Sequence, residues 1–152
     1  MQMGEGSAFF VLSDEKKNAA SAIQGIGLAY KPESTNELAD KLNAFLVSQN
    51  TTLDKIDLVL FGFSGDKDHD KYFSEMLPQI PQNVATGYFK HLSGDHHTAG
   101  SFAVWLGNKI IEKQKIPDAV KINSVSKTSI NSVLIINGYI GINYSFTLLT
   151  KC

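Results

Sequence analysis

The chain ends in two apolar runs, residues 132–136 and 142–149, separated by a bend that carries Gly138 and Gly141. Apolar runs of this length beside glycine are typical of β-strands. Because the two runs follow each other directly, they predict paired antiparallel strands. The fold must therefore accommodate a closing hairpin whose strands are both largely apolar.

Upstream of this hairpin, strand-like and helical patterns alternate. The strand-like runs are residues 8–12, 23–30, 58–61 and 84–89. The helical patterns are residues 35–48, 68–77 and 98–113, the first opened by the capping-box spacing of Ser34 and Glu37. Residues 8–12 and 23–30 could form a hairpin or lie as adjacent strands. With no repeat and no long linker, the order predicts a single α/β domain over residues 1–152, a mixed sheet covered by helices.

Composition excludes several classes of protein. The 152 residues are 43% hydrophobic and 19% charged with a net charge of -1, which lacks the basic excess that nucleic-acid binding needs. Cys152 is the single cysteine, so no intramolecular disulfide can form and a reducing cytoplasm fits best. No run has the length of a membrane span and no signal peptide is visible. We expect no nucleic-acid partner, no membrane association and a cytoplasmic location.

Four segments resemble, in the same order, the landmarks of one enzyme family. Residues 3–8 resemble its M-G-E-G-A-G motif, and residues 53–59 resemble the I-D-Y-V approach to its N-A-H-G-T-x-T loop. Residues 90–94 resemble its K-S-x-x-G-H loop, and the final bend resembles its G-F-G-G-T-N turn, with isoleucines in place of one glycine and the threonine. These segments together are similar to the C-terminal half of the β-ketoacyl synthases, which belong to the thiolase superfamily.

The resemblance implies a fold and a chemistry. It implies a thiolase-like half with a mixed five-stranded sheet and helices packed on it. It also implies fatty-acid or polyketide-type biosynthesis on acyl-carrier-protein thioesters, without a cofactor or metal. Such condensing enzymes use a cysteine nucleophile, and two histidines and a lysine that stabilise the enolate.

The expected catalytic residues are largely missing at the matching positions. Lys90 matches the family lysine, but Gly62 and Asp95 occupy the two histidine positions, and His96 lies one residue late. An aspartate is anionic at neutral pH and would oppose an enolate unless it were buried and protonated. A positioned acid or base contributes about 10² to 10⁴ in rate, so we expect no condensation by this chain alone.

Two ketosynthase-related functions stay open. The chain could be part of a divergent condensing enzyme with Lys90 and His96 in its site. Alternatively, it could be a non-catalytic partner similar to the chain-length-factor subunits that pair with an active ketosynthase, which the missing histidines favour. The expected partners are an N-terminal ketosynthase half or a second ketosynthase subunit, an acyl carrier protein, or a second copy of the chain. Because the chain begins within a family motif, we expect it to be a fragment.

Two other interpretations of the same residues are also open. Lys90 could equally be an ordinary solvated loop lysine, since most lysines are exposed. Carboxylates and imidazoles also gather in two loops that could together bind a divalent cation: Asp66, Asp68, His69, Asp70, Asp95, His96 and His97. Such groups are more often solvated loops or helix caps, with Asp66 or Asp68 capping the helix that follows.

Overall fold

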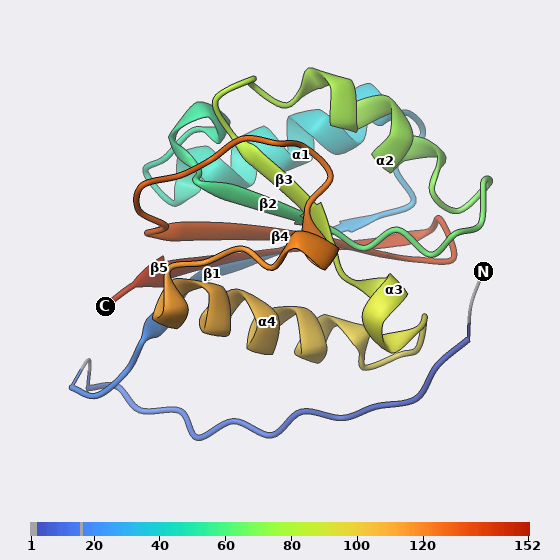
Figure 1. The fold of residues 1–152 in the computed structure, drawn as a ribbon. Coiled ribbons are helices and arrows are strands. Elements are labelled where there is room, and N and C mark those ends of the chain that lie inside the picture. The colour runs from blue at the N-terminus through green and yellow to red at the C-terminus, as the bar shows by residue number, and fades with distance from the viewer. Residues whose placement is uncertain (1–2, 16) are drawn as a thin grey trace.

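A computed structural model describes residues 3–15 and 17–152 and shows one mixed sheet between layers of helices (Figure 1). The strands are β1 (Ser21–Tyr30), β2 (Leu58–Phe61), β3 (Ala85–Tyr88), β4 (Ser132–Tyr139) and β5 (Asn143–Lys151). Their order in the sheet is β1-β5-β4-β2-β3. β2 is parallel to β3 and β4, whereas β5 is antiparallel to β4 and β1. The predicted mixed five-stranded α/β fold is confirmed.

The helices lie on both faces of this sheet. They are α1 (Thr35–Ser48), α2 (Lys71–Met76), α3 (Lys90–Ser93) and α4 (Ala99–Lys113), with short 3₁₀ turns at Leu53–Lys55, Leu77–Gln79 and Asp118–Val120. α1 and α2 cover one face, and α4 runs across the other (Figure 1). None of the helices in the described ranges is long and apolar enough to cross a membrane.

β2 shows how the sheet separates two cores. Val59 and Phe61 point into the core under α1 and α2, whereas Leu58 and Leu60 point into the core under α4. All four side chains are fully buried. A continuous apolar run is typical of a central strand covered on both faces, which is why this strand was predicted correctly.

Helix α1 begins where the capping box predicts. The Ser34 hydroxyl accepts a hydrogen bond from the N–H of Glu37, as a side-chain N-cap does. The carboxylate of Glu37 instead accepts from the N–H of Glu33, one residue earlier than the reciprocal bond of the full motif. The remaining helices also form, although α2 begins at Lys71, three residues later than predicted. There the Asp66 carboxylate accepts from the N–H groups of Asp68 and His69 and holds a turn before the helix.

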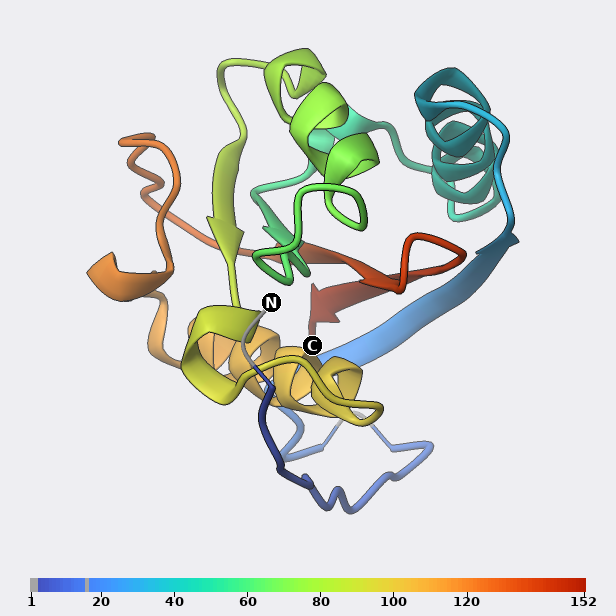
Figure 2. The ribbon, with the colours of Figure 1, turned by 90° about the vertical axis from the view of Figure 1, so that its right-hand side faces the viewer.

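The prediction of a strand at residues 8–12 is wrong. This segment has neither helix nor strand geometry and runs along the side of α4 that faces away from the sheet, as both views show (Figures 1 and 2). Phe9 is 93% exposed and Val11 is fully exposed. The run has strand-forming side chains, but within the described ranges no other strand pairs with it. β1 pairs with β5 and not with residues 8–12, so the hairpin considered for these two runs does not form.

The closing hairpin is confirmed and is longer than its apolar runs. β4 and β5 pair from Ser132 with Thr150 to Tyr139 with Asn143. Ile140 and Gly141 form the bend, both with positive φ (47° and 66°), and the N–H of Ile142 donates to the carbonyl of Tyr139. Two residues of positive φ give a turn whose twist matches that of the strands.

Candidate functional site

Three loops meet at one edge of the sheet. The first follows β2 at Gly62, the second follows β3 at Lys90, and the third is the bend between β4 and β5. Parallel strands bring their carboxyl ends to the same edge, which is why loops distant in sequence meet there. The N–H of Gly62 donates to the carbonyl of Ile136, and the ammonium of Lys90 donates to the carbonyl of Gly138. The residues that carried the family resemblance are therefore neighbours in space.

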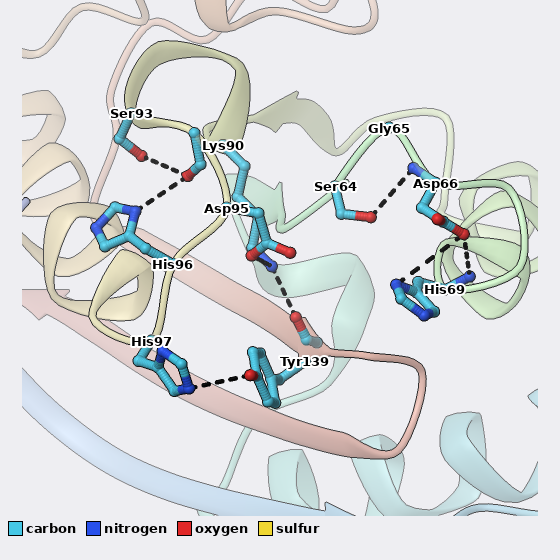
Figure 3. Close-up of polar contacts among 12 residues, drawn as sticks. Ser64, Gly65, Asp66, His69, Lys90, Ser93, Asp95, His96, His97 and Tyr139 are labelled. Atoms are coloured by element: carbon cyan, nitrogen blue, oxygen red, sulfur yellow. Dashed lines mark hydrogen bonds and ion pairs between the residues drawn. The ribbon is translucent and has the colours of Figure 1, made fainter. Parts of the chain in front are cut away.

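Lys90 is buried and is not a solvated loop lysine. Its side chain is 2% exposed, and Nζ lies 2.7 Å from the carbonyl oxygen of Gly138 and 2.7 Å from Oδ1 of Asp95 (Figure 3). The Asp95 carboxylate is buried as well, and Oδ1 faces the ammonium as an ion pair without the angles of a hydrogen bond. A buried ammonium requires a counter-ion, and Asp95 supplies it. The charge of the buried Lys90 ammonium is therefore neutralised by Asp95, the next carboxylate in the same loop.

Gly62, which the resemblance predicts at the first histidine position, is buried with no room for a side chain. A Cβ built on it would lie 2.6 Å from Oδ1 of Asn137 and 3.1 Å from the ring of Phe89. Separations of this size are shorter than van der Waals contact, so the glycine is required by close packing and not by a positive φ. Asn137 thus reaches the space into which a side chain at residue 62 would project. Sequence reasoning missed this residue, because nothing local links it to Gly62.

His96 lies beside the Lys90–Asp95 pair but faces elsewhere. Its Nδ1 is 3.2 Å from the carbonyl oxygen of Gly94, and its ring approaches Gly6 of the N-terminal segment. In Figure 3 the imidazole points away from Lys90, while Asp95 points toward it. The structure therefore brings Lys90, Asp95, Asn137 and Gly62 together and leaves His96 on the outer side of the loop.

The N-terminal segment is fixed to this loop through close backbone contact. The N–H of Gly4 donates to the carbonyl of Asp95, and a Cβ on Gly4 would lie 2.0 Å from the carbonyl oxygen of Ser93. Gly94 has a φ of +76° and touches the backbone of Gly4. Two glycines thus let residues 3–6 lie directly on the loop that carries Asp95.

The loop after β2 is shaped by a buried carboxylate that the sequence analysis assigned only to a possible metal site. Asp70 accepts hydrogen bonds from the N–H and hydroxyl of Ser64 and from the N–H of Gly65. These bonds hold the loop closed. Ser64 and Asp70 are six residues apart, which is longer than the span of an Asx turn, so no standard local motif identifies this contact from the sequence.

The carboxylates and imidazoles of the two loops do not form a metal site. Across residues 3–15 and 17–152, no group of three or more His, Cys, Asp or Glu side chains is arranged to hold a metal ion. Asp70 is bound to its own loop, and His97 pairs with the Tyr139 hydroxyl at 3.0 Å (Figure 3). The N–H of His69, followed by that of Asp68, holds the pKa of Asp66 below its usual value, as expected for a carboxylate that caps a turn.

Solved structures with a similar fold come from ketosynthases and a thiolase-type enzyme. The ishigamide ketosynthase/chain length factor matches 86% of this chain and 38% of its own chain, with a TM-score of 0.68 and 18% identity. A type II polyketide ketosynthase, solved with its acyl-carrier protein and bound to the hexaketide, matches 87% of this chain and 38% of its own, with a TM-score of 0.64 and 14% identity. Bacillus anthracis acetyl-CoA acetyltransferase matches 88% and 31%, with a TM-score of 0.53 and 10% identity.

No protein-family model matches the sequence, and no curated protein is similar to it in sequence. The chain spans about two fifths or less of the length of these three structures. At such low identity, the likeness concerns the fold. The strand order, the helix layers and this likeness show that the chain has the mixed α/β fold found in about two fifths or less of each of these three chains.

Proposed function

We propose that this chain is a non-catalytic ketosynthase-like domain that pairs with an active ketosynthase in polyketide or fatty-acid-type biosynthesis. The observation that carries the proposal is the state of the site: Lys90 is held by Asp95, and Gly62 leaves no side chain at the other histidine position. Without two imidazoles, the enolate formed on decarboxylation lacks its proton-donating partners.

The nucleophile is missing from this site as well. Cys152 is exposed and follows the last residue of β5, whereas the site lies at the bend where β5 begins. Nine strand residues at about 3.4 Å each place that end of β5 roughly 30 Å from the bend. A thiolate at this distance cannot hold an acyl group against Lys90, so the acyl-enzyme would have to form outside residues 1–152.

The expected partners are those found with the structural neighbours. One structural neighbour is a ketosynthase/chain length factor, and another is a ketosynthase in complex with its acyl-carrier protein. These neighbours support an active ketosynthase and an acyl carrier protein as partners of this chain, with acyl chains presented as thioesters. A reducing cytoplasm, which the single cysteine favours, suits thioester chemistry.

The alternative is a divergent condensing enzyme in which Lys90 and His96 act on substrate. The burial of Lys90 at the carboxyl ends of the parallel strands favours it, since functional groups gather at that edge. This alternative requires the loop after Lys90 to turn His96 toward Lys90 and Asp95 away from it.

One assay separates the two functions. The chain is incubated with acyl and malonyl carrier-protein substrates, alone and with an active ketosynthase, and the products are identified by mass spectrometry. We expect no condensation by the chain alone and a changed product length when the ketosynthase is present. Turnover by the chain alone that falls in Lys90→Ala and His96→Ala would refute the proposal and establish the condensing enzyme.

A further inference from the structure

A groove follows the C-terminal half of α4. The buried side chains of Leu106 and Ile110 line its floor, and Trp105, 43% exposed, lines one side. Trp105 and Lys113 are eight residues apart, or about 12 Å along the helix, and beyond Lys113 the chain turns back (Figure 1) and adds Pro117 to the lining. The groove has a volume of about 480 Å³, and small-molecule sites usually measure about 300–1,000 Å³. Its apolar floor therefore has the dimensions of a ligand site.

The rim of this groove is positively charged. Lys109, Lys113 and Lys115 line it, and Asp118 is the one acidic residue among the described residues of the lining. Lys109 and Lys113 share a single carboxylate, that of Glu112, with N–O separations of 2.6 and 3.0 Å. Within residues 3–15 and 17–152, no carboxylate lies at ion-pair distance from Lys115. The rim therefore has more positive than negative charge, so it favours an anionic ligand.

A smaller cavity of about 180 Å³ adjoins the groove at Lys115, which lines both spaces. Lys121 lines the cavity and lies 2.6 Å from Oδ1 of Asp118, which lines the groove, so the two spaces are neighbours. The lining of the cavity includes three further donors: Lys127, Ser124 and Ser126. Lys127 faces Asp57 at 3.7 Å, and neither serine hydroxyl bonds to another described residue. Ammonium and hydroxyl groups donate hydrogen bonds to phosphate oxygens, so the cavity is suited to a phosphate.

Charge is distributed unevenly along the chain. Residues 109–127 contain five lysines and two acidic residues, whereas the whole chain has a net charge of -1. The positive charge is thus gathered where the groove and the cavity lie. An apolar floor beside a group of ammonium ions fits a molecule with a hydrocarbon chain and an anionic head.

We propose that the groove binds a single-chain amphiphile with a phosphate head group. Its hydrocarbon chain lies over Leu106 and Ile110 beside Trp105, and its phosphate reaches Lys115 and Lys121 at the cavity. A groove of this length suits a hydrocarbon chain of medium length. A phosphate suits the head better than a carboxylate, because it carries about two charges and three acceptor oxygens.

The groove is separate from the candidate functional site. Lys90 and Asp95 lie before α4, whereas the groove begins at Trp105, six residues after the first residue of the helix. The proposal therefore depends on the fold and not on the proposed function. A chain with no role in acyl condensation would still bind the amphiphile, and a chain that assists a ketosynthase need not bind it. Failure of the condensation assay and failure of amphiphile binding are therefore separate results.

Tryptophan fluorescence tests the proposal on the intact chain, because Trp105 is its only tryptophan and lines the groove. Decyl phosphate is added below the concentration at which it forms micelles, in a buffer free of phosphate. We expect the emission to shift to shorter wavelength and to saturate at one ligand per chain. Octyl phosphate should bind roughly 4- to 15-fold more weakly, because two buried methylenes are lost. Decanol should bind at least roughly 10-fold more weakly, because it lacks the charge.

Lysine variants test the contacts of the head group while Trp105 stays in place as the reporter. Lys115→Gln and Lys121→Gln should each weaken the binding of decyl phosphate by at least roughly 5-fold without changing the circular dichroism spectrum. Lys41→Gln is the matched control: Lys41 is 41% exposed but lies on α1, across the sheet, and its loss should leave the affinity unchanged.

The proposal is overturned if decyl phosphate does not shift the emission, or if decyl phosphate and decanol bind with equal affinity. An equal loss of affinity in Lys41→Gln and in the two groove variants overturns it as well. Binding to vesicles that contain phosphatidic acid, without binding of decyl phosphate, would also overturn it and would indicate a membrane surface as the partner.

Discussion

Removal of the Asp95 carboxylate should destabilise the protein strongly, because it leaves a buried ammonium without its counter-ion. In Asp95→Asn, Lys90 keeps the carbonyl of Gly138, 2.7 Å away, but loses the ion pair. Breaking one partner of a buried pair costs about 3–5 kcal/mol. Lys90→Met should cost a similar amount, since it leaves Asp95 buried and unpaired.

The double variant Lys90→Met/Asp95→Leu measures whether the two residues depend on each other. With both charges gone, neither residue suffers an unpaired burial, so the free energy of unfolding should fall by clearly less than the sum of the two single losses. Urea unfolding followed by circular dichroism gives all three values. With a slope of about 1–3 kcal/mol/M, each single variant should lower the midpoint by at least about 1 M.

The control for this cycle is an exposed ion pair. Lys113 is 70% exposed and lies 3.0 Å from Glu112, so Lys113→Met should change the stability by less than about 1 kcal/mol. If Lys90→Met and Asp95→Asn were as mild as this control, or if the double variant cost the full sum, Lys90 would not be held by Asp95. The proposed non-catalytic role of this site would then lose its main support.

Three other positions give separate tests. Ile140 has a φ of 47°, which a β-branched residue adopts at a cost, so Ile140→Gly should raise the free energy of unfolding by about 1 kcal/mol in urea titrations, and a loss would contradict the positive φ. Burial, followed by the nearby Tyr72 and Asp70, raises the pKa of Tyr144 to about 12. Above pH 10 the unfolded chain loses this proton while the folded protein keeps it, so the free energy of unfolding falls as the pH rises from 10 to 12. This decline should be less steep in Tyr144→Phe than in the parent. Gly4→Ala should displace the N-terminal segment from Ser93, so limited proteolysis should cut residues 3–20 faster while the rest stays intact, and equal rates would argue against the contact.

Local signals in the sequence predicted most of the elements correctly. The side-chain cap of Ser34 and the four buried residues of β2 each depend on neighbours within one turn or one strand. Residues 8–12 carried an equally clear strand pattern, and the prediction was wrong. A strand pattern describes the side chains, whereas a strand also requires a second backbone beside it.

The matched motifs predicted that Lys90, Gly62 and Asp95 belong to one site, and their catalytic or non-catalytic role stays a prediction. The structure shows an ion pair between Lys90 and Asp95 and close packing of Asn137 and Phe89 against Gly62. Whether Lys90 is solvated or buried depends on Gly138, 48 residues later, and no local pattern encodes that contact. Asn137 was missed for the same reason. Its proximity to Gly62 results from the pairing of β2 with β4, which the sequence order does not specify.

The packing around Gly62 and the charge balance at Asp95 both concern the two positions where the resemblance predicts histidines. A histidine lost without other changes would leave a cavity, and the void left by a missing imidazole costs on the order of 2 kcal/mol. At Gly62 that space is taken by Asn137 and Phe89, and at Asp95 the charge is balanced by Lys90. The space at Gly62 is therefore filled and the charge at Asp95 is balanced, although the buried Oδ1 of Asn137 accepts no hydrogen bond from a described residue. The packing at Gly62 and the ion pair at Asp95 support the proposal that this chain assists another enzyme.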